Sequence, residues 1–275
     1  MNIGIIGQGF VGKAIYQKFS KYYKVFTYDI KAEICNSDLP EVLKRCKIIF
    51  VCLPTPMKSN GDCDLSIVSE TIFKLDSFDN NNIAVIKSTV LPGTTKKFNK
   101  ECKNIQVVFN PEFLTEVNFI EDFKNQNRVI IGGPRPASTK VKNLYRKAYS
   151  SASVIKTGSD SAEMVKYFTN CFLATKVSFS NEIKQICEKI GVDYDKIVEY
   201  GLYDQRIGKT HFSSPGPDGK FGFGGSCFPK DINALINFSE GLGVKPMVLK
   251  SVWKKNLEVR PERDWEKLKG RAVSE

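Results

Sequence analysis

Met1-Asn2-Ile3-Gly4-Ile5-Ile6-Gly7-Gln8-Gly9-Phe10-Val11-Gly12 opens the chain and decides its fold. An apolar strand signal runs into a complete G-x-G-x-x-G, and helical spacing follows over residues 11–19. Glycines at these positions allow a tight turn and a close approach of backbone to pyrophosphate, whose charge suits a helix N-terminus. A second strand signal ends at Asp29, about 20 residues on, where an acid binds ribose hydroxyls and repels a 2′-phosphate. The pattern predicts NAD, with an incidental glycine turn as the alternative, and the cofactor residues are Gly7, Gln8, Gly9, Phe10, Val11, Gly12, Asp29 and Lys31.

Strand and helix signals alternate through the first half of the chain. Further strand signals lie at residues 48–53, 83–86, 106–109 and 129–131, and residues 66–75 suit a helix. Strands separated by helix-length segments predict an α/β fold, an N-terminal Rossmann-type doubly wound parallel sheet.

The pattern changes near residue 155. Long helical segments then replace the strands, with signals at 160–190, at 192–200, from about Asp231 and from about Pro246. A loop rich in Gly, Pro and Ser interrupts these helices at 208–225. We therefore expect an NAD-binding domain over 1–155 and an all-helical domain over 156–275. Residues 270–275 are expected to be a frayed tail.

Composition narrows the class of protein. The 275 residues carry a formal charge of +11, with 41% hydrophobic and 26% charged residues, values that fit a soluble globular protein. No apolar run reaches the ~18 to 20 residues of a membrane span, and no signal peptide is evident, so a cytoplasmic location with reduced cysteines is expected. Eight cysteines without a CxxC pair and one histidine argue against a metal site. The basic charge suits phosphates, and nucleic-acid binding has only this charge behind it.

A second glycine-rich segment, Phe221-Gly222-Phe223-Gly224-Gly225-Ser226-Cys227-Phe228-Pro229-Lys230-Asp231, points to covalent chemistry. Cys227 precedes an expected helix start and lies near Lys230, and both features favour a nucleophilic thiolate. From this segment alone, a buried structural cysteine after a flexible loop is equally plausible. His211 lies in the loop before it and is better suited to the surface or to substrate contact than to a base.

The sequence resembles the UDP-glucose/GDP-mannose dehydrogenase family, because motifs like those above follow one another in the family's order along nearly the whole chain. The motifs are residues 7–12, Val51-Cys52-Leu53-Pro54-Thr55-Pro56, Lys87-Ser88-Thr89-Val90-Leu91-Pro92-Gly93-Thr94-Thr95, Asn110-Pro111-Glu112-Phe113-Leu114-Thr115-Glu116, Ala162-Glu163 through Lys166 and Asn170 to Asn181-Glu182, Asp204-Gln205-Arg206-Ile207-Gly208 and the Cys227 loop. The resemblance implies oxidation of a sugar-nucleotide C6 alcohol to the carboxylate with two NAD⁺, through a thiohemiacetal and a thioester on Cys227. UDP-glucose, giving the polysaccharide precursor UDP-glucuronate, is favoured over N-acetylated UDP-sugars and GDP-mannose.

The resemblance also implies roles for single residues. Lys166 and Asn170, one helical turn apart, would steady charge on the substrate oxygen, Glu112 would be the base for thioester hydrolysis, and Asp231 and Thr89 would hold a water. Further cofactor contacts are expected at Pro54, Thr55, Thr89, Glu116 and Lys230, and further substrate contacts at Phe113, Leu114, Arg206, Phe212, Ser213, Ser214 and Gly224. Arg206 would reach the substrate of a neighbouring subunit, which implies a homodimer. Without the resemblance, solvated surface residues or helix caps would explain these side chains.

The sequence departs from the family in several places. It ends where members continue into a C-terminal Rossmann-like domain, so that third domain is expected to be absent. The residues Pro217-Asp218-Gly219-Lys220 lengthen the substrate loop, and this longer loop could partly replace the third domain. Val117 stands where glycine is usual, and Gln126-Asn127 replaces a Pro-acid pair. Two rival functions remain, a two-electron β-hydroxyacid-type dehydrogenase, against which the Cys227 loop argues, and a non-catalytic protein that binds NAD or a sugar nucleotide.

Overall fold

The computed structural model describes residues 1–78 and 80–274, which divide into two compact units. The first unit contains Met1–Thr55 and Leu65–Lys166, and the second contains Pro56–Asp64 and the chain from Tyr167 onward. The short segment Pro56–Asp64, which lies between the two segments of the first unit in the sequence, therefore belongs to the second unit. The domain boundary expected at residue 155 stays a prediction.

A seven-stranded sheet forms the centre of the first unit, in the order β2-β1-β3-β4-β5-β6-β7. The strands are β1 (Asn2–Ile6), β2 (Lys24–Tyr28), β3 (Ile48–Val51), β4 (Ile83–Ile86), β5 (Gln106–Phe109), β6 (Arg128–Gly132) and β7 (Ser153–Thr157). Neighbouring strands are parallel except β5 and β6, which pair antiparallel through Phe109 and Gly132. This order and direction confirm the predicted Rossmann-type fold class.

The antiparallel step between β5 and β6 differs from a fully parallel sheet and has a consequence for the site. A parallel neighbour requires a crossover to the opposite edge of the sheet, whereas an antiparallel neighbour does not. Residues 110–127 therefore begin and end at the edge where β1, β3, β4 and β5 have their carboxyl ends. In doubly wound sheets this edge is where ligands bind.

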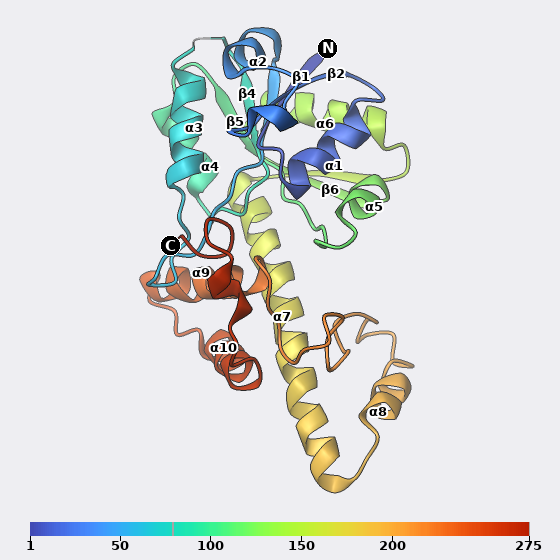
Figure 1. Ribbon diagram of the computed structural model, residues 1–275. Helices are drawn as coiled ribbons and strands as arrows, with labels where there is room; N and C mark the ends of the chain where they lie inside the picture. The colour runs from blue at the N-terminus through green and yellow to red at the C-terminus, as the bar shows by residue number, and fades with distance from the viewer. Residues whose placement is uncertain (79, 275) are drawn as a thin grey trace. The chain divides into compact units, whose positions relative to one another are not determined.

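Helices cover both faces of the sheet (Figure 1). One face packs against α1 (Phe10–Phe19), α5 (Phe119–Lys124) and α6 (Ala137–Ala148), and the other against α2 (Leu39–Arg45), α3 (Ser66–Asp76) and α4 (Thr94–Glu101). Local signals set where these helices begin. Asp38, for example, caps α2 by accepting a hydrogen bond from the backbone N–H of Glu41 at 2.8 Å, and Pro40 follows in the first turn.

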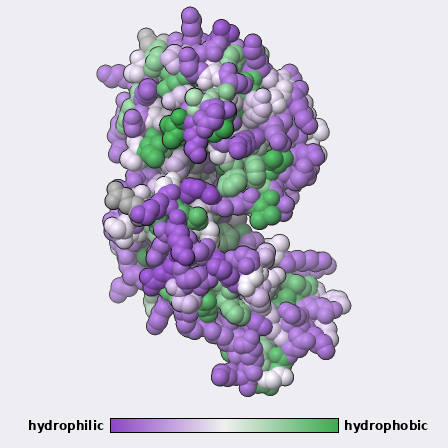
Figure 2. Space-filling view, viewed as in Figure 1, coloured by the Kyte–Doolittle hydropathy of each residue, from purple (hydrophilic) through white to green (hydrophobic). Residues whose placement is uncertain are grey.

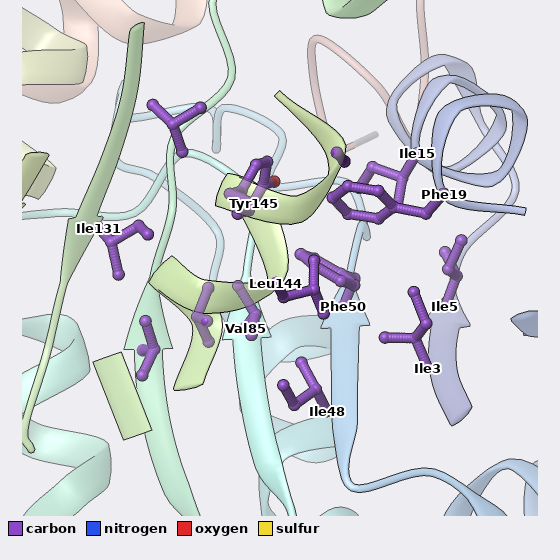
Figure 3. Packing of buried hydrophobic residues seen from close by; sticks show 14 of the residues in the cluster. Ile3, Ile5, Ile15, Phe19, Ile48, Phe50, Val85, Ile131, Leu144 and Tyr145 are labelled. Atoms are coloured by element: carbon purple, nitrogen blue, oxygen red, sulfur yellow. The ribbon is translucent and has the colours of Figure 1, made fainter. Parts of the chain in front are cut away.

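The buried face beneath α1 and α6 shows why near-continuous apolar strands are needed. Figure 3 shows Ile3 and Ile5 of β1 and Phe50 of β3 below Phe19 and Tyr145 from the covering helices. All five side chains are fully buried. Burying an aliphatic or phenylalanine side chain of this size contributes about 1.5 to 3 kcal/mol, so this cluster is a main source of stability for the first unit.

The second unit is helical, as predicted. The long helix α7 (Ser159–Ile190) begins in the first unit and continues into the second, which also contains α8 (Tyr194–Gly201), α9 (Phe228–Gly241), α10 (Met247–Val259) and the 3₁₀ turn η2 (Asp264–Lys267). The Ser178 hydroxyl on α7 donates to the Val252 carbonyl on α10 at 3.0 Å. Trp253 and the fully buried Trp265 pack together with ring centroids 5.2 Å apart, which fixes η2 on α10.

The expectation of a frayed C-terminal tail is wrong. Val273 pairs with Met57 in a parallel bridge, and the N–H of Met57 donates to the Ala272 carbonyl at 2.8 Å. The Ser274 hydroxyl donates to the Asp64 carboxylate at 3.1 Å, and Ala272 is buried. Local composition could not show this order, because the partners lie about 200 residues away in the sequence.

Hydrophilic side chains cover most of the face in Figure 2, with separate hydrophobic patches between them. Across the described part of the chain, no helix combines the length and the apolar character that crossing a bilayer would require.

Candidate active site

The glycine turn between β1 and α1 has the geometry that a dinucleotide needs. Gly7 has a φ of +94°, and a Cβ there would lie 2.3 Å from the Cys52 carbonyl oxygen. A Cβ on Gly12 would lie 1.9 Å from the Gly7 carbonyl oxygen, whereas one on Gly9 would meet nothing within 4 Å. The first and third glycines are thus required by packing, and the second leaves open space where a pyrophosphate can approach the backbone.

Asp29 lies against the same turn. One of its carboxylate oxygens accepts a hydrogen bond from the backbone N–H of Gln8 at 2.7 Å, and the other accepts from the N–H of Lys31 at 3.0 Å. The acid at the end of β2 is therefore fixed beside the glycines. This is the placement from which a carboxylate can bind ribose hydroxyls.

Two alanine substitutions are expected to separate packing from cofactor binding. Gly12→Ala should prevent normal folding, because its Cβ would overlap the Gly7 carbonyl. Gly9→Ala should fold with a normal melting temperature but bind NAD at least about ten-fold more weakly, since its methyl group occupies the path of the pyrophosphate. Calorimetric titration with NAD and thermal unfolding measure the two effects. Unchanged NAD affinity in Gly9→Ala would place the cofactor elsewhere.

The loops after β3 and β4 are joined at the carboxyl edge of the sheet. The Thr55 hydroxyl donates to the Thr89 carbonyl at 2.8 Å, and the Ser88 hydroxyl donates to the Leu53 carbonyl at 2.6 Å. Thr55 and Thr89 are both buried. These hydrogen bonds therefore hold Pro54, Thr55 and Thr89 in two joined loops of the first unit. All three residues are expected to contact the cofactor or a bound water.

Glu112 and Lys166 form a buried ion pair in this unit. The Lys166 ammonium donates to the Glu112 carboxylate at 2.8 Å and to the Glu112 backbone carbonyl at 2.7 Å. The second carboxylate oxygen accepts from the N–H of Leu114 at 2.7 Å. Burial raises the pKa of Glu112, but the charge and hydrogen bond of Lys166 and the Leu114 N–H outweigh it, so that the pKa is lowered overall. The carboxylate is therefore ionised at neutral pH.

Sequence reasoning gave no role to Glu163, although the motif containing it was noticed. Its carboxylate accepts hydrogen bonds from the backbone N–H groups of Gly93 and Thr95 at 2.7 and 2.8 Å, at the start of α4. The side chain is fully buried, and this burial raises its pKa despite the hydrogen bonds. Glu163 thus fixes the first turns of α7 to α4, a long-range contact that no local pattern predicts.

Lys87, at the end of β4, is a second buried residue that sequence reasoning missed. Its ammonium donates to the Asn110 side-chain oxygen at 2.9 Å and to the Pro111 carbonyl at 3.3 Å. Burial lowers the pKa of Lys87 to about 8, against the opposing charge of Glu112. Burial also raises the pKa of the Cys52 thiol to about 12, so Cys52 is a neutral neighbour.

The lowered pKa of Lys87 predicts a pH-dependent stability. The folded state releases this proton near pH 8 and the unfolded chain near pH 10.5, so the contribution of Lys87 to stability is fully present above about 10.5 and lost as the pH falls to 8. Relative to Lys87→Met, the wild type should therefore gain free energy of unfolding by roughly 3 kcal/mol between pH 8 and 10.5. Urea unfolding of both proteins across this range measures it, and parallel curves would contradict the assignment.

The second unit brings together the residues around Cys227. The thiol lies at the N-terminus of α9 and is half-buried, with the Ser226 hydroxyl 3.8 Å from its sulfur. Lys230, one turn on, forms an ion pair with Asp231, whose other carboxylate oxygen accepts from the Asn170 amide at 2.6 Å. Burial lowers the pKa of Lys230, but Asp231 and then Cys227 outweigh this and raise it overall, so its ammonium stays charged and favours a thiolate.

The glycines before Cys227 are clamped by three residues that sequence reasoning missed: Asn256, Arg260 and Asp264. A Cβ on Gly224 would lie 2.5 Å from the Arg260 guanidinium and from the Asp264 carboxylate. Asn256 accepts from the N–H of Phe223 at 2.7 Å and donates to its carbonyl at 3.0 Å. Glycine is thus needed at position 224 because the clamp leaves no room for a side chain.

Residues 217–220 join the same clamp. Asp218 accepts a hydrogen bond from the Arg260 guanidinium at 2.6 Å, and Lys220 pairs with Glu262 at 3.2 Å. Arg260 also donates to the Phe221 carbonyl at 3.3 Å and is itself buried. These residues are therefore an ordered part of the loop that leads to Cys227.

Other predicted substrate residues are spread along this unit. The Phe212 carbonyl accepts from the Tyr194 hydroxyl at 2.6 Å, and the Ser214 hydroxyl donates to the Asn181 side chain at 3.2 Å. Arg206 is exposed and forms a fork with Asp204. Glu116 and Ser213 are exposed, in the first and second unit respectively. Among residues 1–78 and 80–274, no group of three or more His, Cys, Asp or Glu side chains is placed to hold a metal ion.

Two family models match the chain. Residues 30–149 match the NAD binding domain of the UDP-glucose/GDP-mannose dehydrogenase family, and residues 160–258 match its central domain. The first match confirms the prediction of NAD as cofactor.

Individual proteins are similar over most of the chain. UDP-glucose 6-dehydrogenase TuaD of Bacillus subtilis (strain 168) is 37% identical over 234 residues, which cover 82% of this chain and 49% of TuaD. UDP-glucose 6-dehydrogenase AglM of Haloferax volcanii is 30% identical over 310 residues, covering 96% of this chain and 71% of AglM. The structure of a UDP-glucose dehydrogenase from Pyrobaculum islandicum superposes with a TM-score of 0.86 at 29% identity, covering 97% of this chain and 70% of that one.

The chain thus spans about half the length of TuaD. The central-domain match includes the cysteine loop of the second unit. The chain belongs to the UDP-glucose/GDP-mannose dehydrogenase family.

Proposed function

We propose that this chain carries out the NAD-dependent, four-electron oxidation of a sugar-nucleotide C6 alcohol to the carboxylate, with UDP-glucose as substrate and UDP-glucuronate as product. The observation that carries the proposal is the surroundings of Cys227, a half-buried thiol at a helix N-terminus one turn from a buried, charged lysine. Those surroundings favour a thiolate, which a two-electron alcohol oxidation would not need.

Bound NAD⁺ supplies a hydride acceptor at each of two oxidation steps. The first oxidation removes a hydride and a proton from the C6 alcohol and leaves an aldehyde. The Cys227 sulfur then bonds to that carbonyl carbon while the C=O π bond opens and its oxygen takes up the thiol proton, giving a thiohemiacetal that cannot diffuse away. Loss of the second hydride and a proton gives a thioester, and water cleaves its C–S bond to release the carboxylate and restore the thiol.

Four further residues have roles in the proposal. Lys166 and Asn170 lie one turn apart on α7, a spacing that places both on one face of the helix. Their ammonium and amide donate hydrogen bonds toward the oxygen that gains charge. Glu112, ionised and held by Lys166, takes the proton of the water that hydrolyses the thioester. Asp231 orients the Asn170 amide.

A homodimer is part of the proposal, because α7 exposes an apolar stripe. Phe168 and Phe172 are 66% and 55% exposed and stack with ring centroids 6.3 Å apart. Phe179, Ile186 and Ile190 are also exposed and follow at steps of 7, 7 and 4 residues, which keeps them on one helix face. Isolated apolar side chains need no explanation, but a stripe of this length is typical of an interface.

Replacing Phe172 by aspartate is expected to convert the dimer into a monomer, because the new carboxylate would be buried unpaired. Light scattering after size exclusion measures the mass, and Phe73→Asp, an exposed phenylalanine of the first unit, is the control. A wild type that is monomeric at micromolar concentration would contradict the dimer. A cytoplasmic location stays a prediction.

Initial rates with different sugar nucleotides test the substrate. The purified chain is mixed with NAD⁺ and UDP-glucose, an N-acetylated UDP-sugar or GDP-mannose, and absorbance at the NADH band is followed. The proposal expects the fastest NADH formation with UDP-glucose. If NAD binds normally and none of the three sugars gives NADH, the chain by itself is not this enzyme.

A further inference from the structure

The buried ammonium of Lys87 is not used by any step above, although it lies beside the residues that are. A cation enclosed in protein costs several kcal/mol to desolvate, and an apolar side chain of similar length would avoid that cost. Lys87 therefore calls for a reason beyond packing. That reason lies in the hydrogen bonds that its ammonium donates and in the effect of its charge on a neighbouring carboxylate.

Lys87 supports the backbone that carries Glu112. It donates to the Asn110 side chain and the Pro111 carbonyl, the two residues directly before Glu112. The Asn110 amide in turn donates to the Ile130 carbonyl of β6 at 2.7 Å. Lys87 and Asn110 thus join the ends of β4 and β5 to the middle of β6, and the residue that follows Pro111 is the proposed base.

The charge of Lys87 acts on the same carboxylate. Glu112 faces two cations, Lys166 by direct contact and Lys87 through the electrostatic field, whereas the Cys52 thiol near Lys87 is neutral. Two ammonium groups against one carboxylate leave an excess positive charge, which keeps Glu112 ionised even with Lys166 engaged elsewhere.

We infer that Lys87 is a positioning residue for the proposed thioester hydrolysis, holding residues 110–112 in place and serving as the second cation that keeps Glu112 ionised. The inference rests on the proposed function for its catalytic meaning. Its structural content, the dependence of Glu112 on Lys87, can be measured without any turnover.

Lys87→Met and Tyr145→Phe form a matched pair for the test. The Tyr145 hydroxyl donates to the same Asn110 oxygen at 2.5 Å, so its loss removes a neutral hydrogen bond and leaves the ammonium in place. The titration of Glu112 is followed by NMR on protein with ¹³C-labelled glutamate carboxyls, and Glu112→Gln assigns the signal. The titration should move to higher pH in Lys87→Met and stay unchanged in Tyr145→Phe. Lys87→Gln, which keeps an N–H donor without charge, replaces the methionine variant should that fail to fold.

Intact mass of the enzyme during turnover gives the catalytic readout. With UDP-glucose and NAD⁺, Lys87→Met should accumulate the acyl adduct on Cys227, because hydrolysis slows by about 10²-fold when a base is misplaced. NAD affinity should stay as in the wild type. An unshifted Glu112 titration in Lys87→Met, or an equal shift in Tyr145→Phe, would overturn the inference. A wild type that makes no NADH would contradict the proposed function and leave the titration result standing.

Discussion

Cys227→Ser is expected to lose complete turnover, with kcat lower by on the order of 10⁴- to 10⁶-fold, the scale on which loss of a covalent nucleophile acts in other enzymes. A serine hydroxyl is a weak nucleophile at its ordinary pKa, and an oxygen ester resists hydrolysis more than a thioester does. NADH formation with UDP-glucose measures the loss. Cys187→Ala removes another thiol of the same unit, one that is buried on α7, and should keep wild-type activity.

Two results would contradict the role of Cys227. Multiple turnovers by Cys227→Ser would show that the thiol is not the covalent group. A loss of the same size in Cys187→Ala would show that the effect does not depend on the position of the thiol.

Lys166→Met is expected to lose about 3 to 5 kcal/mol of stability at pH 7, the cost of leaving a buried charge without its partner. The cost of a buried pair applies here because the Lys166 and Glu112 side chains are only 4% and 12% exposed. In the wild type, the lowered pKa of Glu112 stabilises the folded state at pH values above the pKa that this carboxyl has in the unfolded chain. The stabilisation is lost as the pH falls through the pKa of Glu112 in the folded state. In Lys166→Met, Glu112 takes up its proton at higher pH, so the deficit should shrink as the pH is lowered.

The double variant Lys166→Met/Glu112→Gln is the control for this prediction. It removes both charges and should recover most of the lost stability, while NADH formation stays low because both proposed roles are gone. Urea unfolding at pH 7 and pH 5 measures the four proteins of this cycle. A double variant no more stable than Lys166→Met alone would show that the ion pair does not hold this segment.

Local signals in the sequence predicted the parts of the fold that depend on local geometry. The turn at Gly7, Gly9 and Gly12 was predicted because steric limits act within a few residues, and the structure shows those limits as close approaches to backbone oxygens. The apolar strands were predicted because strands buried on both faces are apolar throughout. The helix start after Cys227 was visible for the same local reason, with Pro229 in its first turn.

Features that depend on distant partners were not predicted. Lys87 resembles any strand-end lysine in the sequence, and only the fold brings Asn110 and Pro111 to it. Arg260 fixes the Cys227 loop from more than 30 residues away, through contacts with Asp218 and Phe221. The ordered tail at Val273 was predicted to be frayed for the same reason, since its partner is Met57. Family resemblance, in contrast, was the basis for assigning roles to Lys166 and Asp231, and those roles stay predictions.

The ratio of NADH formed to sugar acid produced tests the central proposal most directly. A limiting amount of UDP-glucose is converted to completion with excess NAD⁺, and both products are quantified. Two NADH for each UDP-glucuronate, with no free aldehyde, is the predicted result for oxidation through a thioester on Cys227. One NADH for each sugar, with the aldehyde released, would contradict it and assign the chain a two-electron dehydrogenase activity.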